Sequence, residues 1–306
     1  MQRTVTALLF LTSLLINPLW VSADEHVHFE PDPGFIQLPE TIKLGSCSAV
    51  DVDSKGQIYL FHRGKEPIIC LDENGKYVRS WGDGLVGSAH GLRIDRDGSI
   101  WITDTKKHLV RKFDPEGRLL LTLGQENKAG TGTDQFDKPT DLAFGADGAI
   151  YVSDGYGNSR MMKFSTDGKF IKTWGSPGKG PGQFDTPHAV VVNAEGWVIV
   201  GDRENDRVQI FDSEGQLITI WTGFAPFGLD FDASGTLFAA DGRAHQVLQI
   251  GEGGNVVART GKEGKTPGEF NLPHMLAADA QGNLYVTEIL GERMQRLTRV
   301  EKKPTS

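Results

Sequence analysis

The chain has 306 residues, of which 38 are glycine and only 2 are cysteine, and its formal net charge is −8. So few cysteines exclude a small disulfide scaffold, and the glycines follow no collagen-like period but stand among short apolar runs, which favours many short strands joined by turns. The negative charge argues against a nucleic-acid-binding surface and against a basic membrane-binding patch, so we expect no nucleic-acid partner.

Residues 1–23 have the pattern of a secretory signal peptide. Arg3 gives a basic start, Ala7–Leu15 is an apolar run, and a small-x-small site ends at Ala23. A membrane anchor is the alternative, but Asn17 interrupts the run before the roughly 18 apolar residues that a spanning helix needs. We therefore expect cleavage after Ala23, export to the periplasm or the medium, and no membrane insertion of the mature chain.

Residues 24–44 form an extended segment ahead of the repeated part of the chain. The last repeat runs out of sequence near Val300, so the segment Phe35–Leu44 is predicted to supply its outermost strand. The two cysteines, Cys47 and Cys70, allow two interpretations. In an exported protein they could form a disulfide, or they could remain two separate buried thiols.

Residues 45–301 contain six repeats. In each repeat a turn glycine is followed by alternating apolar residues, and a second turn signal such as Asn74-Gly75 follows in five of them. The six turn glycines are Gly56, Gly98, Gly148, Gly196, Gly235 and Gly282. Glycine accepts the positive φ of tight hairpins, so each repeat predicts four antiparallel strands. The sequence therefore predicts an all-β, six-bladed β-propeller.

The innermost strand of each blade is predicted to begin eight residues before its turn glycine, where it lines the central channel. These six positions hold Ser48, His90, Thr140, His188, Phe227 and His274. Histidines thus occupy alternate blades, about 120° apart, and converge on the axis. Three neutral imidazoles with an open fourth position are typical of a catalytic zinc site. The competing interpretation is three separate channel histidines that bind only water.

Residues six to eight positions after the turn glycines are predicted to surround the mouth above the histidines. They include Arg63, Tyr156 and Arg203. Arginine can hold a carboxylate with two parallel hydrogen bonds, and a phenol beside a divalent cation can act as a base. The competing interpretations are surface ion pairs for the arginines and an exposed loop aromatic for the tyrosine.

Two further sets of repeated residues are interpreted as structural. Acids end the second strand of five blades and are expected to fix turns: Asp104, Asp154, Asp202, Asp241 and Glu288. Tryptophans late in three blades are expected to pack between blades: Trp81, Trp174 and Trp221.

The combination of these residues resembles an NHL-repeat propeller and, more narrowly, the peptidyl-α-hydroxyglycine α-amidating lyase family. The strings that carry the resemblance are Phe61-His-Arg-Gly64, His90-Gly-Leu-Arg-Ile-Asp95, Ser153-Asp-Gly-Tyr-Gly-Asn-Ser-Arg160, Pro181-Gly-Gln-Phe-Asp-Thr-Pro-His188, Asp202-Arg-Glu-Asn205 and Leu272-Pro-His274. The similarity runs through all six blades, from about Val50 to Val300.

The resemblance implies a zinc ion held by His90, His188 and His274, with Tyr156, Arg63 and Arg203 as catalytic residues. It implies a lyase that splits a peptidyl- or acyl-α-hydroxyglycine into an amide and glyoxylate, so the expected partner is a peptide or small molecule with an α-hydroxyglycine-like end. Two other functions stay open. One is a non-catalytic exported NHL propeller that binds a protein or glycan, and the other is a metal-dependent, lactonase-like hydrolase.

The chain also departs from the family pattern. The family binds a structural calcium ion through two backbone carbonyls, at positions that match Val50 and Leu92, and through an aspartate. Met275 stands at the aspartate position here, so a calcium site would lack one ligand. Leu272 replaces a methionine of the family, and Gly157 occupies one of its cysteine positions.

Overall fold

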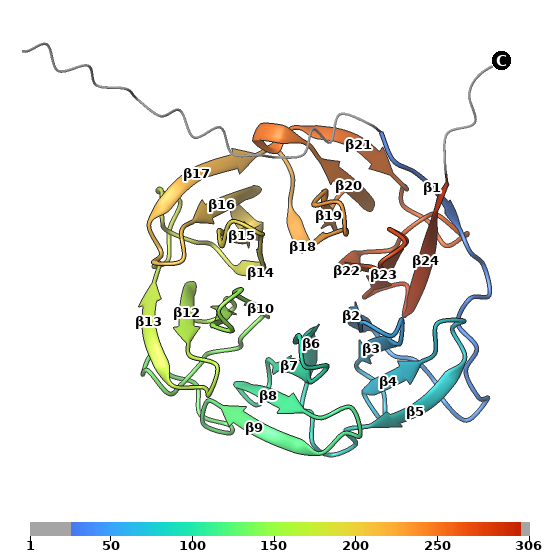
Figure 1. Ribbon diagram of the computed structural model, residues 1–306, viewed down its shortest axis with the longest axis horizontal. Coiled ribbons are helices and arrows are strands. Elements are labelled where there is room, and N and C mark those ends of the chain that lie inside the picture. Colours follow the sequence, from blue (N-terminus) through green and yellow to red (C-terminus); the bar gives the residue numbers. More distant parts are fainter. Residues whose placement is uncertain (1–25, 301–306) are drawn as a thin grey trace, which may run out of the picture.

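The computed structural model describes residues 26–300, which form six four-stranded antiparallel sheets arranged around a common axis (Figure 1). The prediction of an all-β, six-bladed propeller is confirmed. The predicted signal peptide, residues 1–23, lies outside the described residues. Among residues 26–300 there is no helix long and apolar enough to cross a membrane.

The blades follow one another along the chain, and each begins with its innermost strand. Blade 1 consists of β2 (Cys47–Val52), β3 (Ile58–His62), β4 (Ile68–Leu71) and β5 (Tyr77–Trp81); blade 2 of β6 (Ala89–Ile94), β7 (Ile100–Asp104), β8 (Leu109–Phe113) and β9 (Leu119–Leu123); blade 3 of β10 (Asp141–Phe144), β11 (Ile150–Asp154), β12 (Arg160–Phe164) and β13 (Phe170–Trp174).

Blade 4 consists of β14 (Pro187–Val192), β15 (Val198–Asp202), β16 (Arg207–Phe211) and β17 (Leu217–Thr222); blade 5 of β18 (Pro226–Phe231), β19 (Leu237–Asp241), β20 (Gln246–Ile250) and β21 (Val256–Thr260); blade 6 of β22 (Pro273–Ala278), β23 (Leu284–Glu288), β24 (Arg293–Val300) and β1 (His28–Pro31). Two short 3₁₀ turns, η1 (Arg203–Asn205) and η2 (Glu252–Gly254), complete the described elements.

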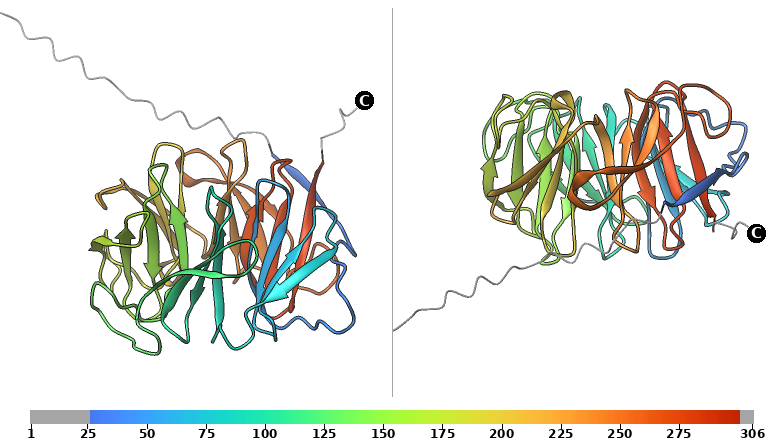
Figure 2. Two further views of the ribbon diagram at one scale, coloured as in Figure 1. Left: turned by 60° about the horizontal axis from the view of Figure 1, so that its bottom comes forward. Right: turned by 90° about the horizontal axis from the view of Figure 1, so that it is seen from above.

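The ring is closed by an N-terminal strand, but not by the predicted one. β1 pairs with β24 in antiparallel register, His28 opposite Val300, so the two ends of the described chain lie side by side (Figure 2). The prediction that Phe35–Leu44 supplies this strand is wrong. That segment instead packs outside blade 1, where Gln37 pairs with Lys76. Phe29 of the closing strand packs against Phe238 of blade 5, with the ring centroids 5.7 Å apart.

The blades pack through the tryptophans that the sequence singled out. A Cβ atom on the turn glycine Gly117 of blade 2 would lie 3.0 Å from the Trp81 indole of blade 1. Gly215 meets Trp174 in the same way, at 2.8 Å. These glycines therefore have two roles. They leave room for the indole of the neighbouring blade, and they adopt the positive φ of the turn, +86° at Gly117. The prediction that the tryptophans pack between blades is confirmed.

The acids at the ends of the second strands are buried and fix loops, as predicted. Asp202 accepts hydrogen bonds from the backbone N–H of Asp185 and from the Arg207 guanidinium. Blade 1 has His62 at this position, and its Nδ1 accepts the backbone N–H groups of Gly45 and Gly64 at 3.1 Å. A neutral imidazole thus takes the place of the carboxylate, because both groups can accept backbone donors.

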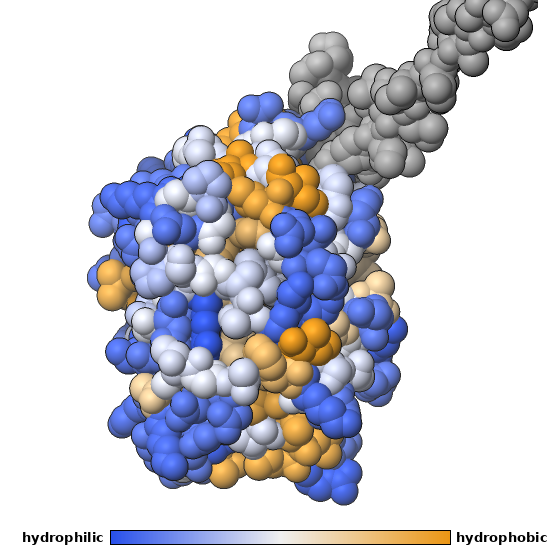
Figure 3. Space-filling model, turned by 90° about the vertical axis from the view of Figure 1, so that its left-hand side faces the viewer, coloured by the Kyte–Doolittle hydropathy of each residue, from blue (hydrophilic) through white to orange (hydrophobic). Residues whose placement is uncertain are grey.

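The outer strands of the propeller are partly apolar, and the two cysteines lie inside it. The outer strands carry exposed apolar side chains, such as Ile171 on β13 and Ile218 on β17, on a side of the molecule where hydrophilic and apolar residues are mixed (Figure 3). Cys47 and Cys70 are both buried and both free. Of the two interpretations, the structure therefore shows two separate buried thiols.

Candidate metal centre

Three histidines meet on the propeller axis, as their alternate positions predicted. His90 lies on β6, His188 on β14 and His274 on β22, and all three are buried. The distances between their ring centroids are 4.7 Å, 4.8 Å and 4.8 Å, so the rings form a nearly equilateral triangle. Within the described chain, this is the only group of His, Cys, Asp or Glu side chains close enough to share a metal ion.

Each imidazole is oriented by the backbone of the next blade. The Nδ1 atom of His90 donates to the carbonyl oxygen of Thr140, that of His188 to Phe227, and that of His274 to Ser48, each at 2.6 Å. These three acceptor residues occupy, in the blades without histidine, the same strand position that the histidines occupy in theirs. A proton on Nδ1 leaves a lone pair on Nε2, directed at the axis, and such a second hydrogen bond is how proteins orient metal-binding histidines.

The electrostatics keep these histidines neutral. Burial lowers the pKa of His90 and His188 well below the usual value for histidine, and lowers that of His274 to about 3. The nearby positive charge of Arg203 acts in the same direction at all three. Because a metal ion binds the neutral imidazole, the site is ready to bind one at neutral pH without displacing protons from Nε2.

Tyr156 lies directly over the histidines, on the loop that follows β11. Its hydroxyl oxygen is 3.0 Å from Nε2 of His90 and 3.1 Å from Nε2 of His188. One hydroxyl proton cannot satisfy both nitrogen acceptors, so one lone pair lacks a proton. A cation between the phenol oxygen and the imidazoles would resolve this shortage, which is a second observation that fits a metal ion at this point.

Arg203 stands next to this hydroxyl. Its Nη1 donates to the Tyr156 oxygen at 3.3 Å, and its guanidinium carbon lies 4.7 Å from the ring centroid of Phe227. Glu204 holds the other side of the guanidinium, with its Oε1 2.8 Å from Nε and 2.7 Å from Nη2 of Arg203. The repeat pattern predicted roles for Tyr156 and Arg203, but it predicted neither the contact with Glu204 nor the stacking on Phe227.

Arg63 lies on the same face and is exposed. Its Nε donates to the carbonyl oxygen of Ala89, the residue before His90, at 3.2 Å. No carboxylate of residues 26–300 lies within ion-pairing distance of it. It lines a cavity of about 240 Å³ between blades 1 and 2, together with Val86 and Ser88. Arg63 is therefore a cation beside the histidines that is free to bind an anionic group.

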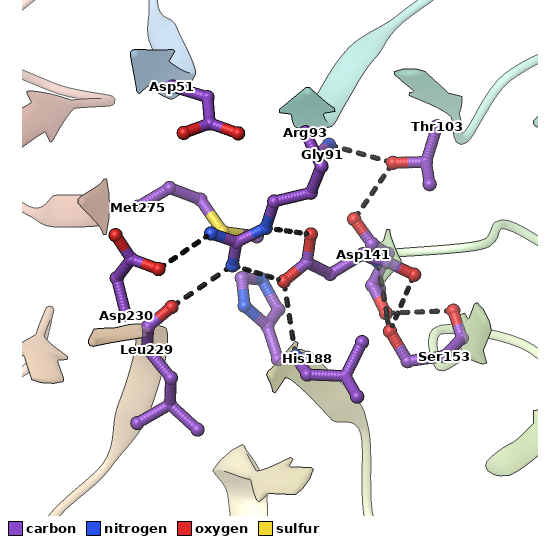
Figure 4. Close-up of polar contacts among 12 residues, drawn as sticks. Asp51, Gly91, Arg93, Thr103, Asp141, Ser153, His188, Leu229, Asp230 and Met275 are labelled. Carbon is purple, nitrogen blue, oxygen red and sulfur yellow. Dashed lines mark hydrogen bonds and ion pairs between the residues drawn. The ribbon is translucent and has the colours of Figure 1, made fainter. Parts of the chain in front are cut away.

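The three histidines fit a transition metal. The site expected for calcium, near Val50, Leu92 and Met275, does not fit that ion. Three neutral imidazole nitrogens with one open side suit Zn²⁺. The calcium expectation concerned the backbone carbonyls of Val50 and Leu92, and Ca²⁺ requires six or more oxygen ligands. Met275 contributes a buried thioether where the family has a carboxylate, and the Arg93 guanidinium lies beside it (Figure 4). The residues present do not fit a calcium ion.

The channel below the histidines contains two aspartates whose charge is disfavoured. Asp51 and Asp230 are partly buried, and this burial raises the pKa of both; the charge of Asp230 raises the pKa of Asp51 further, while the Arg93 guanidinium lowers both. Asp141 is the third carboxylate of the cluster. With one arginine against three carboxylates, a proton on Asp51 or Asp230 relieves the repulsion.

This cluster predicts a pH dependence of stability. In the unfolded chain Asp51 loses its proton near pH 4, whereas the folded protein retains it to higher pH, so the stability that it contributes is complete below about pH 4 and is lost as the pH rises toward its raised pKa. We expect Asp51→Asn to remove this loss, so that the variant gains stability relative to wild type between pH 4 and 8. Urea unfolding across this range measures the difference, with exposed Asp97→Asn as the control; parallel curves for the Asp51 variant and wild type would contradict the prediction.

Comparison with known proteins places the chain in a family. A model of the NHL repeat matches residues 87–113 and 184–211. The chain is 33% identical over 325 residues to the peptidylglycine alpha-amidating monooxygenase of Rattus norvegicus, an alignment that covers 92% of this chain and 33% of that protein. The chain thus spans about a third of the length of the first curated relatives that it matches.

Two relatives match over most of both chains. The protein named "Probable peptidyl-alpha-hydroxyglycine alpha-amidating lyase" in Caenorhabditis elegans is 30% identical, and the alignment covers 91% of this chain and 90% of that protein. The NHL repeat-containing protein 3 of Homo sapiens is 32% identical, with 89% and 84% covered.

Among solved structures, a streptogramin B lyase has a TM-score of 0.64 at 15% identity, with 90% of this chain and 98% of that chain covered. A gluconolactonase of Xanthomonas campestris has a TM-score of 0.66 at 16% identity, with 84% and 87% covered. These two structures show a shared fold and no more. The relatives, in contrast, show that the chain belongs to the family of NHL-repeat six-bladed propellers that includes the peptidyl-α-hydroxyglycine α-amidating lyases.

Proposed function

We propose that this protein is a zinc-dependent lyase that cleaves a peptidyl- or acyl-α-hydroxyglycine into an amide and glyoxylate. The observation that carries the proposal is the convergence of three unprotonated Nε2 atoms and the Tyr156 hydroxyl on one point of the axis. The names of the amidating-lyase relatives support the reaction, and the neutral nitrogen donors support zinc.

His90, His188 and His274 would hold the zinc ion, which supplies a Lewis acid that makes the substrate hydroxyl easier to deprotonate. Tyr156 would be the base, because its oxygen lies about 3 Å from two of the Nε2 atoms and would therefore adjoin a substrate hydroxyl held at the same point. Arg203 keeps the phenol oxygen in place and stabilises the negative charge that the phenolate carries before it takes the proton. Arg63, which has no carboxylate partner among the described residues, binds the carboxylate of the hydroxyglycine.

The reaction balances without an oxidant or a reductant. Tyr156 takes the proton of the α-hydroxyl, the C–O electron pair forms the aldehyde of glyoxylate, and the C–N bond breaks. The amide nitrogen receives the electron pair of that bond and a proton, which Tyr156 can return. The net change is the division of one molecule into an amide and an aldehyde, so the chain's own residues need only bind, orient and move one proton.

We further propose that the mature protein acts after export, on a peptide or small acyl compound with an α-hydroxyglycine-like end. A second candidate function is a non-catalytic NHL propeller that binds a protein partner, which the similarity to NHL repeat-containing protein 3 favours. A binding scaffold has no need for three imidazoles with their Nε2 lone pairs directed at one point. That geometry favours the lyase over the scaffold.

The direct test is turnover of N-benzoyl-α-hydroxyglycine by the purified, zinc-loaded protein. We expect benzamide and glyoxylate in equal amounts, loss of release when a chelator removes the metal, and recovery when zinc is added back. Heat-denatured protein controls for spontaneous breakdown of the substrate. Release at the spontaneous rate by metal-loaded protein between pH 5 and 9 would contradict the proposed reaction on such carbinolamides.

A further inference from the structure

A buried arginine lies on the axis of the channel, deeper than the histidines. Arg93 projects from β6, and its guanidinium contacts Asp141 through two parallel hydrogen bonds, Nε to Oδ1 at 3.2 Å and Nη2 to Oδ2 at 2.8 Å (Figure 4). Nη2 also donates to the carbonyl oxygen of Leu229 at 3.0 Å, and Nη1 lies 3.5 Å from Oδ1 of Asp230. One side chain of blade 2 thereby joins blades 3 and 5.

The carboxylates around Arg93 extend this network to the remaining blades. Asp141 of blade 3 accepts the backbone N–H of Val190 in blade 4 at 3.1 Å. Asp230 of blade 5 accepts the N–H of Ala278 in blade 6 at 2.9 Å. Asp51 of blade 1 accepts the N–H of Ile94, the residue after Arg93, at 2.7 Å. All six innermost strands are therefore tied together at one level of the channel.

We propose that Arg93 is the structural cation of this channel, and that the chain holds its six blades together at this level without calcium. A bound divalent ion stabilises such a site by drawing carboxylates and carbonyl oxygens from several strands to one positive centre. The Arg93 guanidinium draws two carboxylates and one carbonyl from blades 3 and 5 to one positive centre. Met275, at the place where a carboxylate ligand would be needed, faces this guanidinium instead (Figure 4).

The chemistry of the guanidinium suits it to this structural role. The guanidinium is covalently part of the chain and remains charged at every accessible pH, so it costs no binding entropy and cannot be removed by a chelator. Its planar fork also matches the carboxylate of Asp141, a geometry that a lysine ammonium cannot supply. A divalent ion placed among the same residues would be repelled by the guanidinium already there.

The network around Arg93 also helps to hold the backbone that orients His90. Asp141 directly follows Thr140, whose carbonyl oxygen accepts the Nδ1 proton of His90. Thr103 donates to that same carbonyl oxygen at 2.8 Å. Displacement of β10 after loss of Arg93 would therefore move the acceptor that orients one of the three histidines, and zinc affinity would fall with stability.

The first experiment needs no variant. Thermal unfolding of the zinc-loaded wild-type protein is compared in calcium-depleted buffer and after addition of 1 mM Ca²⁺, and bound calcium is measured after gel filtration. We expect no calcium to be retained and no change in Tm. Retention of one equivalent of Ca²⁺ together with a rise in Tm would overturn the proposal.

Variants test the role of Arg93 itself. Arg93→Met is expected to lower Tm by about 10 °C, because Asp141 and Asp230 are left without their buried cation. Arg96→Met, three residues further on and exposed, is the matched control and should leave Tm unchanged. The double variant Arg93→Met/Met275→Asp should regain stability when Ca²⁺ is added. An Arg93→Met protein as stable as wild type would overturn the proposal.

If Arg93→Met does not fold, Arg93→Lys provides the test, because lysine keeps the charge but cannot make the two parallel hydrogen bonds to Asp141. We expect a smaller fall in Tm than for Arg93→Met, a Tm that remains insensitive to Ca²⁺, and a measurable loss of zinc affinity. A lysine variant with wild-type Tm would show that the parallel hydrogen bonds to Asp141 do not matter, against the proposal. None of these readouts depends on the proposed lyase reaction.

Discussion

His188→Ala is expected to lose bound zinc and to release no glyoxylate above the spontaneous rate. Two imidazoles remain in this variant, and they cannot complete the three-nitrogen site, since the His188 ring lies 4.7–4.8 Å from both partner rings. The wild-type protein should carry about one equivalent of zinc. Metal analysis by mass spectrometry of protein purified without added chelator measures both values.

The control is His26→Ala, since His26 is exposed and, among the described residues, its ring contacts only His28, at the start of the outermost strand β1. This variant should keep both metal and activity. A His188→Ala protein that keeps its zinc, or a wild-type protein without metal after reconstitution, would remove the basis of the lyase proposal and favour the binding scaffold. A correctly folded variant is verified by an unchanged circular dichroism spectrum.

The turn glycines made much of this site predictable from sequence. Because they mark the same turn in every blade, counting back from Gly98, Gly196 and Gly282 reaches one level of the channel, and the histidines found there do converge. Side-chain direction in a strand follows its position in the register, so the register alone determines which residues line the axis. The loop position of Tyr156 was also predictable to the correct face.

Other parts of the site depend on features that residue types do not reveal. Backbone carbonyls orient the three histidines, and any residue at positions 48, 140 and 227 supplies a carbonyl, so nothing in the sequence marks this role. Glu204 reaches Arg203 through a local turn that is absent from the other blades. The pairing of β1 with β24 brings Phe29 against Phe238 of blade 5, a neighbour that only the folded ring brings near.

The burial and pairing of Arg93 could not be predicted from the sequence either. An arginine in a strand of apolar residues normally indicates an exposed side chain, since arginine is rarely fully buried unless it is paired. Its partners Asp141 and Asp230 lie 48 and 137 positions away in other blades. The pairing becomes visible only when the ring closes, although all three residues stand on predicted innermost strands.

Tyr156→Phe is the prediction that separates the reaction from the metal. The phenylalanine keeps the ring against His90 and His188, at centroid distances of 5.1 Å and 5.7 Å in the wild type, and removes only the oxygen. Zinc content should therefore remain at the wild-type value, whereas kcat for glyoxylate release should fall by about 10²–10⁴-fold, the usual effect of losing a positioned base. Tyr77→Phe, whose hydroxyl contacts only Ser80, is the control and should match wild type.

The division between kcat and KM makes this variant informative. Arg63 binds the substrate carboxylate in the proposed complex and is untouched by the change, so KM should stay within a few-fold of wild type. An equal loss of zinc would mean that the Tyr156 oxygen serves chiefly to hold the metal. Unchanged turnover would mean that another group accepts the hydroxyl proton. Since no other hydroxyl or carboxylate of the described residues contacts the Nε2 atoms of His90 and His188, that result would require the substrate to bind in a different place.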